Sequence, residues 1–132
     1  MPNTIAEYYT DELAEWNRLI VFCKKEMDEF GHKLAEVIEQ NTIPDIAAKV
    51  ENEQDKLNVM SENFKKLQVQ IQQQKAALKK DSILIDNTLI NTETEKQQNE
   101  LRHNMQQSEK KYIDTKYECY NFLSEIVKKR KG

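Results

Sequence analysis

Residues 6–37 read AEYYTDELAEWNRLIVFCKKEMDEFGHKLAEV, a stretch in which apolar and aromatic side chains recur at alternating spacings of three and four. The positions that form this repeat are Ala6, Tyr9, Leu13, Trp16, Ile20, Cys23, Met27, Phe30, Leu34 and Val37. Such a repeat places one apolar line along a helix, as in a coiled coil. Because that line has to be buried against other helices, the sequence predicts a helical bundle.

The same spacing occurs twice more in the chain. In the middle it is formed by Ile43, Ile46, Val50, Glu53, Leu57, Met60, Phe64, Leu67, Ile71, Gln74 and Leu78. In the last third it is formed by Leu101, Met105, Ser108, Tyr112, Thr115, Cys119, Phe122 and Ile126. Three repeats predict an all-α fold, an elongated antiparallel three-helix up-down-up bundle with coiled-coil-like packing. No stretch shows a strand pattern, so we expect no β-structure.

The first connection is expected at residues 40–43. Asn41 can adopt the left-handed conformation that ends a helix, and Thr42 can cap the next one. Pro44 is tolerated in the first turn of a helix because its missing N–H is not needed there.

The second connection is expected within residues 82–91, although this stretch holds no glycine or proline. The repeat of the last third extends back to Leu84, whereas the middle repeat extends forward to Ile85. A continuous coiled coil does not absorb an offset of one residue. The alternative is a single helix of about 87 residues. With the turn, we expect helices at about 4–40, 43–81 and 90–128.

Composition agrees with long helices around a narrow core, since 38% of the 132 residues are apolar and 33% are charged. We expect a single domain, 1–132. A net charge of −3 provides no general attraction to nucleic acid, although residues 128–132 form a basic tail. No apolar run approaches the ~20 residues that span a bilayer, and the N-terminus lacks a secretion signal pattern. We therefore expect a cytoplasmic protein without a membrane partner.

One pattern is typical of metal chemistry, because each histidine follows a glutamate by three residues. The pairs are Glu29–His32 and Glu100–His103. Paired Glu-x-x-His motifs hold the metals of di-iron helical bundles. Both pairs fall at helix positions that point away from the apolar line, so we expect no bound metal and no cofactor. A metal-dependent bundle enzyme remains an alternative.

Other enzyme chemistry finds no support in the residues. Cys23 and Cys119 lie on the apolar repeats at different heights, which predicts two buried, unpaired thiols. No glycine cluster could hold a phosphate, and no serine, histidine and aspartate group can be assembled. We expect no enzymatic activity and no small-molecule substrate.

Apolar residues beside the repeats indicate a protein partner. Ile5, Tyr8, Leu19 and Phe22 flank the first repeat, and Ile113, Tyr120, Leu123 and Val127 flank the last. These side chains either widen the buried face or remain exposed as a docking patch.

Polar residues occupy the start of the last repeat, at Asn87, Asn91, Thr94 and Gln98. Such residues cannot drive packing by apolar burial, so this end is either frayed or hydrogen-bonded. We expect it to leave Tyr9, Leu13 and Trp16 short of apolar cover. Inside the middle repeat, Glu53 and Gln74 either set the helix register or lie at solvated ends.

These observations predict a non-enzymatic protein–protein interaction module, a self-associating helical scaffold or adaptor. The expected partner is a second copy of the chain, giving a homodimer, or another helical protein. Its interface candidates are Tyr8, Leu19 and Phe22, together with Tyr9, Leu13 and Trp16. A second alternative is a binder of nucleic acid or acidic surfaces that acts through the basic tail.

Overall fold

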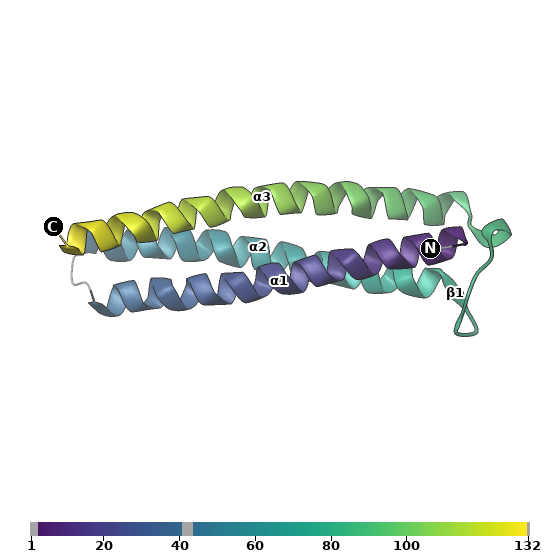
Figure 1. The fold of residues 1–132 in the computed structure, drawn as a ribbon, viewed down its shortest axis with the longest axis horizontal. Coiled ribbons are helices and arrows are strands. Elements are labelled where there is room, and N and C mark those ends of the chain that lie inside the picture. The colour runs from purple at the N-terminus through teal and green to yellow at the C-terminus, as the bar shows by residue number, and fades with distance from the viewer. Residues whose placement is uncertain (1–2, 41–43, 132) are drawn as a thin grey trace. The chain divides into compact units, whose positions relative to one another are not determined.

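The computed structural model describes residues 3–40 and 44–131, apart from the side chains of Pro44 and residues 129–131. The elements are α1 (Ile5–Gln40), α2 (Pro44–Ala77), β1 (Lys79–Lys80), β2 (Ile83–Leu84), the 3-10 helix η1 (Asn87–Leu89) and α3 (Thr92–Lys131) (Figure 1). The protein is an all-α three-helix bundle, which confirms the predicted fold class. No helix in the described ranges is long and apolar enough to cross a membrane.

The chain divides into two compact units, and each of the three helices contributes to both. Unit 1 comprises residues 1–21 and 64–107, and unit 2 comprises residues 22–63 and 108–132. That all 132 residues act as one domain stays a prediction.

Hydrogen bonds and ion pairs define how the helices run within each unit. In unit 2, Lys56 pairs with Glu118 and Asn63 donates to Ser108, so α2 and α3 are antiparallel. In unit 1, Gln98 donates to the carbonyl oxygen of Tyr9, and Arg102 donates to Glu12. The residue numbers rise together in this second case, so α1 and α3 are parallel. Both relations agree with the predicted up-down-up order.

The apolar repeats form the core of each unit, as predicted. The most fully buried side chains in unit 1 include Leu13, Ile20, Phe64, Ile71, Leu78, Leu101 and Met105. Those in unit 2 include Cys23, Leu34, Val50 and Cys119. Five predicted positions are only half-buried, namely Tyr9, Trp16, Ile46, Thr115 and Phe122, and Ile43 lies outside the described residues. Glu53, Gln74 and Ser108 are buried with the apolar residues, so the repeat carries polar side chains into the core.

The second connection spans residues 78–91, so it begins before the predicted range of 82–91, and its structure corrects two expectations. The middle helix ends at Ala77 instead of residue 81, and a β-hairpin follows although no strand was expected. Lys79 pairs with Leu84, and Lys80 pairs with Ile83. The prediction of no β-structure is therefore wrong, and so is the alternative of one continuous helix.

The hairpin loop consists of two residues with a left-handed backbone conformation, which the sequence does not predict. Asp81 and Ser82, which form its two-residue loop, have φ angles of 54° and 66°. Loops of this kind require positive φ at both central residues, a conformation typical of Asn-Gly and Asp-Gly pairs. An Asp-Ser pair adopts it at a cost in free energy and so leaves a weak sequence signal.

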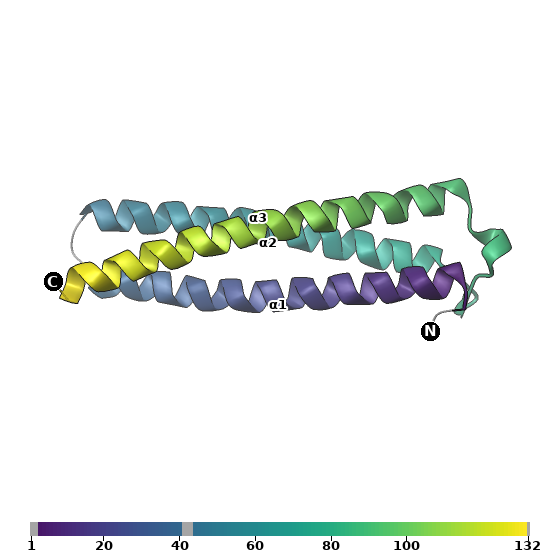
Figure 2. The same ribbon diagram turned by 45° about the horizontal axis from the view of Figure 1, so that its top comes forward.

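Polar side chains stabilise the helix ends of unit 1. Asn91 accepts a hydrogen bond from the backbone N–H of Thr94 at 2.8 Å and caps α3. Asn87 accepts one from the backbone N–H of Ile5 at 2.9 Å, so the connection between α2 and α3 is tied to the first turn of α1. Figure 2 shows this connection beside the start of α1. The caps expected at Asn41 and Thr42 lie outside the described residues.

Candidate protein-interaction surfaces

The six interface candidates differ in how far they are exposed. Tyr8 is 50% exposed and Phe22 56%, whereas Leu19, Tyr9 and Trp16 are half-buried. Leu13 is only 1% exposed. The expectation that Leu13 lies under poor cover is therefore wrong, and its side chain offers no surface to a partner. The interface role of the other five stays a prediction.

The polar end of the bundle near Leu13 is hydrogen-bonded. Gln98 is completely buried, and its amide nitrogen Nε2 donates to the carbonyl oxygen of Tyr9 at 3.2 Å and to Oε1 of Glu12 at 3.1 Å. These two acceptors lie next to Leu13 along α1. A polar side chain whose hydrogen bonds are all made excludes water as an apolar one does. Of the two possibilities for this end, hydrogen bonding is confirmed.

A second layer of contacts completes this polar cluster. Nε2 of Gln74 donates to Oε1 of Gln98 and to the carbonyl oxygen of Thr94, each at 3.0 Å. Nε of Arg102 donates to Oε2 of Glu12 at 2.8 Å. Three helices are joined in one network, which favours the register-setting role for Gln74.

In unit 2 the corresponding contact between α1 and α3 is centred on Glu26. Its carboxylate accepts hydrogen bonds from Nζ of Lys116 at 2.9 Å and from the hydroxyl of Tyr112 at 2.7 Å. Burial raises the pKa of Glu26, but the hydrogen bonds from Lys116 and Tyr112 together lower it by more than burial raises it, so the net shift is downward. Burial and the bond to Glu26 raise the pKa of Tyr112. Both groups keep their ordinary charge at neutral pH.

A buried carboxylate lies in the core of unit 2. Glu53 is 8% exposed, its Oε1 lies 3.6 Å from Nζ of Lys56, and its Oε2 has no hydrogen-bond partner within the described part of the chain. Lys56 also pairs with Glu118 at 2.9 Å. Burial, and then the charge of Glu53, raises the pKa of the Cys119 thiol to about 11. Glu53 is buried as a register-setting residue would be, although its hydrogen bonding is incomplete.

The two cysteines are buried free thiols, as predicted. Burial raises the pKa of Cys23 to about 11 as well. A thiol with so high a pKa is almost entirely protonated at neutral pH and is a poor nucleophile. Both cysteines therefore serve as small apolar side chains in the core of unit 2.

An exposed apolar stripe follows the outer face of α3 in unit 2. We define the α3 stripe as Ile113, Tyr117, Tyr120 and Val127. Tyr117 and Tyr120 are 61% and 60% exposed, and Ile113 and Val127 are exposed too, whereas Leu123 is half-buried. The spacing of four, three and seven places all four on one side of the helix. The sequence pattern predicts Ile113, Tyr120 and Val127, each of which directly follows a position of the repeat. It does not predict Tyr117, which lies two residues after Thr115.

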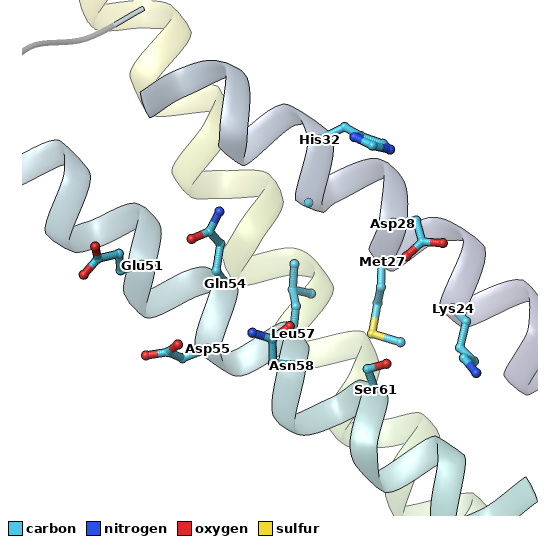
Figure 3. Close-up of a pocket in the computed structure, with 11 residues that line it drawn as sticks. Lys24, Met27, Asp28, His32, Glu51, Gln54, Asp55, Leu57, Asn58 and Ser61 are labelled. Atoms are coloured by element: carbon cyan, nitrogen blue, oxygen red, sulfur yellow. The ribbon is translucent and has the colours of Figure 1, made fainter. Parts of the chain in front are cut away.

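A cleft separates α1 from α2 in unit 2, with a volume of about 470 Å³. Met27 and Leu57 lie between the two helices (Figure 3). Gly31 of α1 is also among the residues that line the cleft. Asp28 on α1 and Glu51 and Asp55 on α2 add three carboxylates to the lining. No sequence signal had indicated this cleft, because its shape depends on the distance between two helices.

The two Glu-x-x-His pairs point to solvent as predicted, since Glu29, His32, Glu100 and His103 are all exposed. Within residues 3–40 and 44–131, no group of three or more metal-ligating side chains comes together. The absence of a bound metal stays a prediction, which elemental analysis of the purified protein would test. The basic tail lies mostly outside the described side chains, with Lys128 as its described and exposed member.

Comparison with known proteins finds no matching family model, no similar curated protein and no similar solved structure.

Proposed function

We propose that this chain is a non-enzymatic protein–protein interaction module, a helical scaffold that self-associates as at least a homodimer. The observation that carries the proposal is the exposed apolar surface of unit 2, which lies outside a core that is already filled. Phe22 on α1 and the α3 stripe expose large side chains to water. Exposed apolar side chains along one side of a helix, as in the α3 stripe, are typical of association sites.

The amount of exposed surface is in the range that an interface needs. Aromatic side chains bury roughly 150–250 Å² each, so Phe22 and the α3 stripe, about half exposed, offer roughly 500 Å² in all. Covering such a patch on two copies buries about 1,000 Å², which is near the lower limit for specific association. At about 25 cal/mol per Å², this burial offsets part of the free-energy cost of the translational and rotational entropy that is lost on docking. The expected association is weak and reversible.

The expected cellular location follows from the thiols. Cys23 and Cys119 are free, and a chain with unpaired cysteines suits a reducing compartment. We therefore propose a cytoplasmic protein.

Sedimentation velocity from low to high micromolar concentration tests self-association. The wild type should shift toward a larger species as concentration rises, and Tyr120→Glu should shift less while staying folded. Tyr120 is chosen because its side chain is 60% exposed, so its replacement leaves the core untouched. Val69→Glu is the matched control, since Val69 is an equally exposed apolar residue in unit 1. A wild type that remains monomeric throughout would refute the proposal.

A further inference from the structure

Gly31 lies in the interior of α1, where a glycine requires an explanation. Glycine is the least favourable helix residue after proline. Two structural needs usually justify it, a left-handed backbone or the close approach of another group. Neither is present, since Gly31 has no positive φ and a Cβ atom added to it would meet nothing within 4 Å. Among residues 3–40 and 44–131, nothing in the fold calls for glycine at this position.

The effect of Gly31 is to keep the cleft between α1 and α2 open. Met27 and Leu57 are almost completely buried and form an apolar base, and a longer side chain at position 31 would extend into the space above them. The methionine sulfur is a favourable neighbour for an aromatic ring. The cleft therefore fits an apolar or aromatic side chain from outside the chain.

The charges around the cleft are mostly negative. Asp28, Glu51 and Asp55 line it, and among the described residues none of these carboxylates takes part in an ion pair or hydrogen bond. Lys24 also lines the cleft but has an interaction of its own. A matching partner would therefore bring positive charge beside its apolar side chain.

The α3 stripe of this chain has that combination. Tyr117 and Tyr120 are its most exposed members, and Lys110 and Lys128 lie along one edge of the stripe. Lys110 precedes Ile113 by one helical turn and Lys128 follows Val127 directly, so both ammonium groups can flank a docked stripe. Both lysines are exposed and form no ion pair within the described ranges.

We propose that the Gly31 cleft receives the α3 stripe of a second copy of this chain. A tyrosine ring of the stripe enters the space that Gly31 leaves open. One of the two lysines at the edge of the stripe approaches the carboxylates of Asp28, Glu51 and Asp55, since the two lysines are ~27 Å apart along α3. This inference rests on the proposed self-association and identifies the two surfaces that meet. Because cleft and stripe are different faces, the contact either forms twice in a closed dimer or repeats in a ring or chain of copies.

Filling the cleft tests the proposal without damage to the fold. Gly31→Met should raise the midpoint of urea unfolding, because methionine is a far better helix former than glycine. It should also weaken self-association, measured by sedimentation, by about tenfold or more. Gly31→Ala should stabilise the fold equally but weaken association less. The matched control is Ala14→Met, which adds the same side chain at an exposed position of α1 in unit 1 and should leave association unchanged.

A mixing experiment then tests which faces meet. Gly31→Met keeps the stripe but blocks the cleft, and Tyr117→Glu with Tyr120→Glu keeps the cleft but removes the stripe. Each variant alone should be a folded monomer, and an equimolar mixture should form a 1:1 complex through the one intact contact. A contact of stripe with stripe would give no complex in the mixture.

The outcomes separate this inference from the proposed function. A wild type that stays monomeric would refute both. A wild type that associates while Gly31→Met associates equally well would refute the cleft but leave self-association standing. A mixture that stays monomeric would show that the stripe and the cleft do not bind each other.

Discussion

Gln74 and Gln98 meet in the core of unit 1, where Nε2 of Gln74 donates to Oε1 of Gln98 at 3.0 Å. Both glutamines occupy positions at which a coiled-coil repeat ordinarily has apolar residues. Every further bond of this pair reaches another helix or its cap, including the bond from Gln98 to the carbonyl oxygen of Tyr9. A one-turn shift of α3 against α1 or α2 would break these bonds together, so the pair disfavours wrong registers.

Replacing Gln98 by alanine should lower the free energy of unfolding by about 2 kcal/mol, because buried partners lose their hydrogen bonds. Gln74→Ala should cost a similar amount, and the double variant should cost less than both together. Urea unfolding of the four proteins measures this coupling. Gln73→Ala is the control, since Gln73 is exposed on α2 and its loss should change little. Strictly additive costs would contradict a coupled pair.

The carboxylate of Glu26 should make stability depend on acid pH. Hydrogen bonds from Lys116 and Tyr112 lower its pKa in the folded state below the unfolded value of about 4.3. Its contribution is therefore complete above that unfolded value and disappears as the pH falls through the folded pKa. At neutral pH, Glu26→Gln should lower the free energy of unfolding by about 1.5 kcal/mol, a deficit that shrinks as the pH falls below the unfolded value of about 4.3. Urea unfolding across this range, with the exposed Glu29→Gln as control, would reveal the effect; an equal deficit at every pH would exclude it.

Glu53 should make the folded state less stable than an apolar residue of similar size would at the same position. Its Oε2 is buried without a partner in the described part of the chain, and a buried unsatisfied group costs about 1–3 kcal/mol. Glu53→Met should therefore raise the free energy of unfolding by about 1–2 kcal/mol. Thermal and urea unfolding measure this change, and Gln72→Met, at an exposed position of the same helix outside the cleft, should have little effect. A Glu53→Met variant that is less stable than the wild type would mean that the carboxylate of Glu53 has all its hydrogen-bond partners in solution.

Removing the steric cost of the left-handed backbone conformation at Ser82 should stabilise the hairpin. Glycine adopts a φ of 66° without steric cost, so Ser82→Gly should raise the free energy of unfolding by about 1 kcal/mol. The same substitution at Ser124, inside α3, should lower it by about 0.5–1 kcal/mol. Opposite signs for the two variants in urea unfolding would confirm the hairpin loop, whereas a loss at both positions would argue for a helical conformation at Ser82.

The sequence alone determined which side of each helix is buried. Burial depends on the local spacing of three and four, and this spacing carried even the polar residues Gln74 and Ser108 into the core. It also predicted that the chain turns between the second and third helices, because an offset of one residue cannot persist along one helix, although the connection begins before the predicted range. The exposure of Glu29 and His32 follows from the same phase.

Only the tertiary structure decided how these faces are completed. Gln98 is buried with hydrogen bonds to Tyr9 and Glu12, which lie 89 and 86 positions away, a pairing set by the register between helices and not by local spacing. The cleft beside Gly31 depends on the distance between α1 and α2, since a helix by itself has no groove. The hairpin at residues 79–84 depends on two left-handed residues whose small local cost is offset by pairing and by the burial of Leu78. Periodicity fixes a direction for each side chain, whereas contacts between helices need the three-dimensional arrangement.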